Sequence, residues 1–176
     1  PAGVDSLQFA LLGDPMGGLP TFRQLVDLVR RTPARFLLLP GNLTNNGADP
    51  AQWQRFFQAL APVAPQLPLA MLGGVEEYEG YGAHLRPTLL HRYLRSDGEQ
   101  RPYYAFTRDG AHFVCLDANA YFPHGLPDTS AQYQWLRQQL KSANWREANW
   151  RFVVVHQPPF SESKPGYPRD LRLRRL

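Results

Sequence analysis

The feature that most constrains the fold is an alternation of short apolar runs with amphipathic segments along the first half of the chain. The apolar runs cover residues 7–13, 36–39 and 67–72, and the segments between them, 21–31 and 51–60, carry apolar residues at helical spacing. Strands that alternate with helices in this order form a mainly parallel sheet flanked by helices. The sequence therefore predicts an α/β fold.

Each apolar run ends in a short turn that contains glycine. The three turns are Gly13-Asp14, Gly41-Asn42 and Gly73-Gly74. The carboxyl ends of parallel strands meet at one edge of the sheet, and open α/β sheets bind their ligands at that edge. We therefore expect the functional residues to come from these turns.

The second half of the chain follows a different pattern. Residues 103–107 and 111–117 are typical of two strands, and the Asp-Gly pair between them favours a tight hairpin turn. A helix is predicted over 129–142 and a buried strand over 150–156.

Composition limits the classes of function. The 176 residues suit one domain with a sizeable core, and 43% of them are hydrophobic. No apolar run approaches the ~20 residues of a membrane-spanning helix. Cys115 is the only cysteine, so no intrachain disulfide can form, and we expect an inert core residue. The compartment stays unknown, with an exported or periplasmic location slightly favoured over the cytoplasm.

The charge distribution gives little indication of a partner. The formal net charge is +4, and the densest basic segment, residues 169–175, contains four arginines. This segment can contact phosphate or an acidic partner, although a solvated helix face is the favoured interpretation. No basic strip is interleaved with aromatic residues, so we expect no nucleic-acid partner.

Four segments at the predicted strand ends carry motifs in a distinctive order. They are Gly13-Asp14-Pro15-Met16, Gly41-Asn42-Leu43-Thr44-Asn45-Asn46-Gly47, Gly73-Gly74-Val75-Glu76 and Val155-His156-Gln157-Pro158-Pro159. Together they resemble the motifs Gly-Asp-x-His, Gly-Asp-x-x-(Asp)-x-Gly, Gly-Asn-His-(Asp/Glu) and a lone histidine of the calcineurin-like metallophosphoesterases, including their purple acid phosphatase branch.

The resemblance implies a metallophosphoesterase-like four-layer α/β/β/α sandwich that forms a single domain over residues 1–176. The family's last motif, Gly-His-x-His, is absent from this sequence, so the fold can be incomplete at its C-terminal end. In active members of the family, two cations about 3.5–4 Å apart clamp the attacking and leaving oxygens of a phosphoryl displacement.

By the same resemblance, several metal-ligand positions are changed. Asp14 and His156 match ligands of the family. Met16 replaces a histidine, and its thioether is a soft, weak ligand for the metals involved. Asn42 replaces the aspartate that bridges the two metals, brings no negative charge and is a doubtful ligand. Asn45 stands where purple acid phosphatases have a tyrosine ligand.

The third motif is the most altered. Gly74 replaces an asparagine ligand and has no side chain. Val75 replaces the histidine thought to protonate the leaving group, and valine cannot transfer a proton, so no catalytic residue is assigned. Glu76 takes the motif's acidic position, and both Glu76 and Glu77 are expected on the surface or in a loop. Four other histidines match no motif and are expected to be structural or solvent-facing: His84, His91, His112 and His124.

Three functions stay open. The chain is a degenerate, catalytically inactive member of the family used for binding or as a subunit of an assembly; or it is a metal-dependent phosphoesterase with a reduced site built on Asp14 and His156; or it binds a protein partner through residues 169–175. A small phosphate ester is an expected ligand only if the chain is active. No cofactor is expected, or at most one weakly bound divalent metal at Asp14 and His156.

Overall fold

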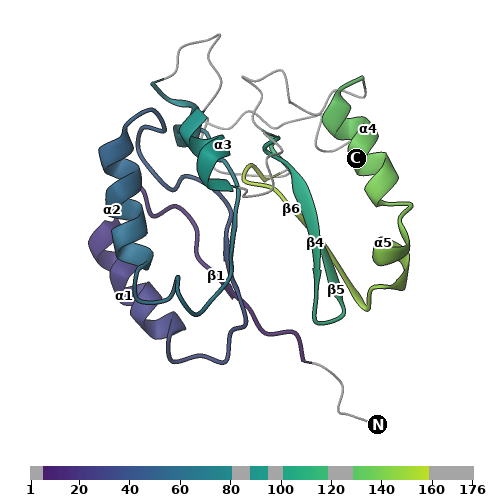
Figure 1. Ribbon diagram of the computed structural model, residues 1–176, viewed down its shortest axis with the longest axis horizontal. Helices are drawn as coiled ribbons and strands as arrows, with labels where there is room; N and C mark the ends of the chain where they lie inside the picture. The colour runs from purple at the N-terminus through teal and green to yellow at the C-terminus, as the bar shows by residue number, and fades with distance from the viewer. Residues whose placement is uncertain (1–5, 81–87, 95–100, 119–128, 159–176) are drawn as a thin grey trace. The chain divides into compact units, whose positions relative to one another are not determined.

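The protein forms two compact units, one within residues 1–102 and the other within residues 103–176. A computed structural model describes residues 6–80, 88–94, 101–118 and 129–158. Within these described ranges, each unit contains one three-stranded sheet (Figure 1).

The first unit has the predicted order of strands and helices. Its sheet consists of the parallel strands β1 (Ala10–Leu11), β2 (Leu37–Leu39) and β3 (Leu69–Met71), which lie side by side in that order. Helix α1 (Leu19–Val29) connects β1 to β2, and helix α2 (Pro50–Leu60) connects β2 to β3. The strands are shorter than the apolar runs, because the ends of each run already belong to the flanking loops.

Both helices lie on the same face of this sheet (Figure 1). Each buries one side, since its apolar residues recur every three or four positions. Phe22 and Val26 of α1 and Phe56 of α2 are at most 2% exposed, and the ring centroids of Phe22 and Phe56 are 5.9 Å apart. The central strand β2 is buried along its whole length.

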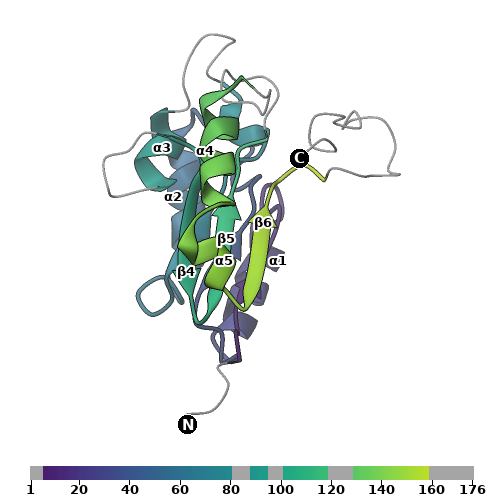
Figure 2. The same cartoon turned by 90° about the vertical axis from the view of Figure 1, so that its right-hand side faces the viewer.

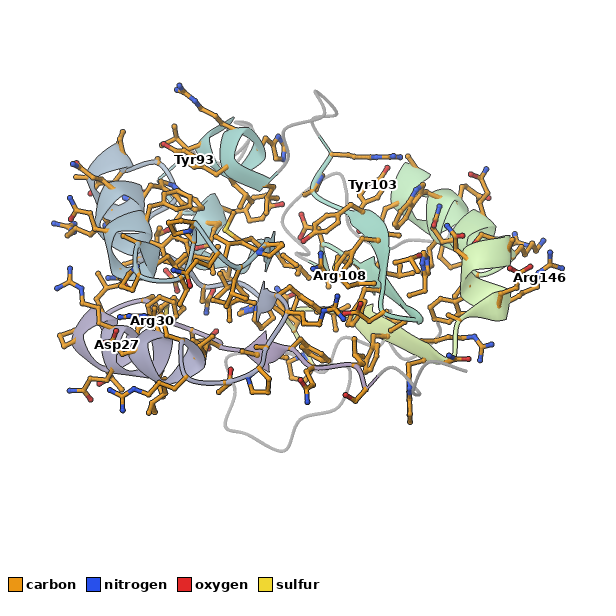
Figure 3. The ribbon with its side chains drawn as sticks, turned by 60° about the horizontal axis from the view of Figure 1, so that its bottom comes forward. Asp27, Arg30, Tyr93, Tyr103, Arg108 and Arg146 are labelled. Carbon is orange, nitrogen blue, oxygen red and sulfur yellow. The ribbon has the colours of Figure 1, made fainter. Side chains whose placement is uncertain are left out.

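Two short elements follow β3 in the first unit. They are the 3₁₀-helix η1 (Glu76–Tyr78) and the helix α3 (Thr88–Leu94). Tyr93 of α3 packs on α2, with its ring centroid 5.1 Å from that of Trp53 and 4.9 Å from that of Phe57 (Figure 3). Because η1 begins five residues after β3 ends, it lies near the carboxyl ends of the strands.

The second unit begins with the predicted hairpin. Strands β4 (Tyr104–Arg108) and β5 (Ala111–Cys115) are antiparallel, and β6 (Trp150–Val154) pairs with β5 in parallel. Asp109 and Gly110 form the turn with φ angles of 48° and 75°, the left-handed backbone that a tight hairpin turn needs at both positions. The prediction of an Asp-Gly hairpin is confirmed.

Helices cover this second sheet as well. Helix α4 (Ala131–Gln139) lies within the predicted helix over 129–142, and a second short helix, α5 (Ala143–Glu147), follows it. The Ser142 hydroxyl accepts a hydrogen bond from the Trp145 N–H at 3.1 Å, which caps the start of α5. Figure 2 shows both helices on one face of the sheet.

Aromatic rings join the three strands of the second sheet. The ring centroids of Phe106 and Phe113 are 4.8 Å apart, and those of Phe113 and Phe152 are 4.7 Å apart. Cys115 is fully buried on β5, and this burial raises the pKa of its thiol to about 12. A thiol that stays protonated is a poor nucleophile, which confirms the prediction of an inert core cysteine.

The predicted α/β class is confirmed by these two sheets and their helices. Within the described ranges, no helix is long and apolar enough to cross a membrane.

Trp53 gives a test of the core of the first unit. It is 0% exposed, and its indole N–H donates to the Gly47 carbonyl at 2.9 Å. The substitution Trp53→Phe removes this donor and leaves a small void, and we expect the free energy of unfolding to fall by about 1–3 kcal/mol. Urea unfolding followed by far-UV circular dichroism measures the change. Trp150→Phe is the matched control, because Trp150 is 59% exposed, and an equal loss in both variants would contradict the assignment.

Candidate functional site

The candidate site lies in the first unit, in the loops that follow β1, β2 and β3. Asp14 follows β1 and Asn42 follows β2, and both have left-handed backbones, with φ angles of 47° and 52°. This conformation is uncommon outside glycine, although Asp and Asn tolerate it best. The Met16 N–H donates to the Asn42 carbonyl at 3.2 Å, so the first two loops contact each other. The structure thus brings the first two predicted motifs together.

Asn42 is the most deeply buried of the predicted metal-ligand residues. Its side chain is 1% exposed, and its Oδ1 accepts a hydrogen bond from the Glu76 N–H at 3.3 Å. The Nδ2 donor is buried and has no hydrogen-bond partner among the described residues. An unpaired buried donor costs about 1–3 kcal/mol, so this amide is poorly satisfied. It is also neutral, whereas the resemblance predicts a bridging carboxylate at this position.

Gly74 lies directly against Asn42. A Cβ added to Gly74 would overlap the backbone nitrogen and Oδ1 of Asn42 and would come within 3.0 Å of its Cγ. The predicted position of the asparagine ligand therefore has no room for a side chain unless the backbone moves. Val75 follows at the start of η1 and is half-buried.

Glu77 is the residue that holds these loops together. It was predicted on the surface or in a loop, and it lies in the loop after β3 but not on the surface. It is 0% exposed. Its Oε1 accepts hydrogen bonds from the Leu43 N–H at 2.8 Å, the Thr44 N–H at 2.9 Å and the Thr44 hydroxyl at 3.2 Å. Its Oε2 accepts one from the Gly74 N–H at 2.7 Å. One carboxylate therefore ties the loop after β2 to the loop after β3.

The environment of Glu77 affects its protonation. Burial raises the pKa of its carboxyl group, and the hydrogen bonds from Thr44, Gly74 and Leu43 oppose that rise. Among the described residues, no basic side chain forms an ion pair with it. The sequence did signal one of these contacts, because the three-residue spacing from Gly74 to Glu77 allows an acidic side chain to return to a backbone N–H.

The second unit carries the other residue that the resemblance predicts as a retained ligand. His156 follows β6 and is half-buried. Asp14 and His156 therefore belong to different units, and their pairing stays a prediction.

The other histidines behave as predicted where the structure describes them. His112 is 2% exposed, its Nδ1 lies 2.7 Å from the Thr107 hydroxyl oxygen, and burial lowers its pKa. His91 is 8% exposed on α3. These environments support structural roles, whereas His84, His124 and residues 169–175 lie outside the described residues.

We tested whether these residues fit the two-metal centre that the resemblance implies. Across residues 6–80, 88–94, 101–118 and 129–158, no group of three or more His, Cys, Asp or Glu side chains could hold a metal ion. The Oδ1 of Asn42 already accepts a hydrogen bond from the Glu76 N–H, and Gly74 has no side chain that could bind a metal. The described residues of the first unit therefore do not by themselves fit a two-metal centre.

Comparison with known families identifies the fold. The sequence model of the calcineurin-like phosphoesterase family matches residues 7–175. This chain belongs to the calcineurin-like phosphoesterase family. The match runs through both units and confirms the resemblance seen in the strand-end motifs.

Individual relatives come from the purple acid phosphatases. Purple acid phosphatase 21 of Arabidopsis thaliana is 26% identical over 175 residues, which cover 96% of this chain and 39% of the relative. Probable purple acid phosphatase 20 of the same plant is also 26% identical, over 90% of this chain and 38% of its own length. This chain thus spans about two fifths of the length of these relatives.

A solved structure supports the fold. Purple acid phosphatase PPD1 from seeds of yellow lupin (Lupinus luteus) aligns with a TM-score of 0.68 at 15% sequence identity, over 87% of this chain and 31% of the lupin protein. At this identity the likeness concerns the fold alone, and it confirms the metallophosphoesterase-like class.

The comparisons correct one prediction. We expected no cofactor, or at most one weakly bound divalent metal, but purple acid phosphatase-like proteins are dinuclear metal enzymes, so the family points to metal cofactors. The prediction was wrong because it considered only which ligand side chains are replaced in each motif, and not the metal content of the family.

Replacement of Glu77 tests its role in joining the loops. In Glu77→Gln the new amide NH₂ must face one of the N–H groups that now donate to the carboxylate, so two donors would oppose each other. We therefore expect the free energy of unfolding to fall by about 1–3 kcal/mol. Glu79→Gln is the matched control, because Glu79 is exposed on the next turn. Chemical unfolding of both variants measures the difference, and no loss in Glu77→Gln would contradict the role.

The same pair of variants shows a pH dependence. Since the pKa of Glu77 is raised above its ordinary value of 4.5, the folded chain holds this proton more tightly than the unfolded chain. The contribution of Glu77 to stability is therefore full below pH 4.5 and declines as the pH rises through the folded pKa. Unfolding measured between pH 4 and 8 should show this decline in the wild type and in Glu79→Gln. The decline should be reduced in Glu77→Gln, and equal slopes in all three proteins would refute it.

Proposed function

We propose that this chain is a degenerate member of its family that is catalytically inactive and serves for binding or as a subunit of an assembly. The observation that carries the proposal is the neutral, buried amide of Asn42 at the position of the bridging aspartate. Its oxygen is already engaged by the Glu76 N–H, so the amide is not poised to serve as a bridge.

The electrostatic cost of losing the bridge is large. Two divalent cations about 4 Å apart repel each other by about 16 kcal/mol at an effective dielectric constant near 20, four times the value for unit charges. A bridging carboxylate offsets part of this repulsion, and a neutral amide offsets much less. A two-metal mechanism therefore loses one of its main sources of stabilisation at this position.

The competing function is metal-dependent hydrolysis of a phosphomonoester or phosphodiester. Family membership favours it. Asp14 gives it local support, because this exposed residue keeps a left-handed backbone at the end of β1, and strained conformations are common at functional sites. The two functions predict opposite results in one assay.

The binding role requires a surface that contacts the partner. The four arginines of residues 169–175 are the candidate contact, and an exported location is part of the same proposal. No nucleic acid is expected, for want of a basic strip interleaved with aromatic residues.

Hydrolysis of p-nitrophenyl phosphate and bis-p-nitrophenyl phosphate tests the proposal. The purified protein is assayed between pH 5 and 8 with added iron, zinc, manganese or magnesium, and a purple acid phosphatase serves as the positive control. We expect no turnover above the rate of metal and buffer alone, because Asn42 supplies no bridging charge.

Matched variants guard against a contaminating phosphatase. Asp14→Ala removes the retained carboxylate, whereas Asp27→Ala changes an exposed acid on α1 (Figure 3). Turnover that persists in Asp27→Ala and disappears in Asp14→Ala would overturn the proposal and establish hydrolysis.

A further inference from the structure

The third motif can be aligned with this chain in two ways. The family pattern is Gly-Asn-His-(Asp/Glu), and the chain has two adjacent glycines followed by valine and two adjacent glutamates. The pattern can start at Gly73 and end at Glu76, or it can start at Gly74 and end at Glu77. Sequence alone does not separate these alignments, because both place glycine first and an acid fourth.

The packing around the two glycines distinguishes the two alignments. A Cβ on Gly73 would first meet the Leu90 Cδ2 at 2.8 Å, and the tip of a leucine side chain can move aside. A Cβ on Gly74 would overlap the backbone nitrogen of Asn42, which cannot move without displacing the loop after β2. The position that sterically requires glycine is therefore Gly74.

The environments of the two glutamates distinguish the two alignments independently of the glycines. Glu77 is 0% exposed and accepts four hydrogen bonds, from the loop after β2 and from Gly74. Glu76 is half-buried, and within the described part of the chain no group pairs with its carboxylate. Glu77 is therefore the acidic residue at the end of the third motif, because it links this motif to the second motif by hydrogen bonds.

We infer that the motif runs from Gly74 to Glu77, so that Glu76 occupies the position of the family's histidine and Val75 that of the asparagine ligand. The side chain at the place of the proton donor is then a carboxyl group, which can accept and release a proton, and not valine. The defect of the third motif then narrows to the missing ligand at Val75, and the changes at Met16, Asn42 and Asn45 in the first two motifs are unaffected.

Backbone contacts place Glu76 beside the candidate site. Its N–H donates to the Oδ1 of Asn42 at 3.3 Å, and its carbonyl accepts the Gly47 N–H at 2.9 Å. Both backbone groups of Glu76, its N–H and its carbonyl, are therefore hydrogen-bonded to the loop after β2. Its neighbour Asn42 has a buried Nδ2 donor that no group in the described part of the chain accepts, so the hydrogen-bonding capacity of this amide is only partly used there.

Two double substitutions, each made in an Asn42→Asp background, test the alignment. Val75→Asn with Glu76→His restores the family motif in the inferred alignment, and Gly74→Asn with Val75→His restores it in the other. We expect the melting temperature of the first to stay within about 2 °C of the background, and that of the second to fall by about 5 °C or more. Circular dichroism measures both.

Metal uptake provides a readout that a purely structural role would not move. The first variant should bind more Zn²⁺ per chain than the Asn42→Asp background, measured by equilibrium dialysis and elemental analysis, since Val75→Asn restores the amide ligand of the motif beside the new carboxylate at position 42. The second should bind no more than the background. Equal stability of the two variants, or equal or greater Zn²⁺ uptake by the second, would overturn the inference.

Single substitutions keep the test decisive if a multiple variant fails to fold. Gly74→Ala should lower the melting temperature by more than Gly73→Ala, and the reverse order would overturn the alignment. None of these measurements uses a phosphate ester, so their outcome is separate from the assay of turnover in the wild type.

Discussion

The carboxylate of Glu77 is the interaction on which the candidate site depends. It binds backbone N–H groups of two loops that are more than thirty residues apart in the sequence, and its burial leaves it no water to replace them. Buried charge without a cation is costly, and here four donors offset that cost. A single side chain thereby fixes how the loops after β2 and β3 approach each other.

The close approach then dictates the neighbouring residues. With the loops held together by Glu77, Gly74 has no room for a Cβ, and the same is true of Gly47, where an added Cβ would overlap the backbone of Glu77. The Gly47 carbonyl in turn accepts the indole N–H of Trp53, which is buried on α2. A continuous series of contacts therefore joins the site to the hydrophobic core of the first unit.

Much of the fold followed from residue patterns. The alternation of apolar runs and amphipathic segments predicted the parallel sheet, and Asp109-Gly110 predicted the hairpin, because both signals are local in sequence. Glu77 was missed because its partners include Leu43 and Thr44, far away in the sequence, and composition gives no hint of such a contact. Adjacent like residues, Gly73-Gly74 and Glu76-Glu77, also hid which of each pair is the constrained one.

Family membership and local chemistry answer different questions about this chain. The fold depends on the loops at the strand ends, on a glycine where two loops approach closely, and on an acidic residue that links them. Gly74 and Glu77 meet these requirements in this chain. Catalysis by two metals needs charge at the bridge, and a single change from carboxylate to amide removes it with almost no change in shape. A site can therefore keep the geometry that defines its family while its electrostatics change, and in the proposed function the buried Asn42 is the position of that change.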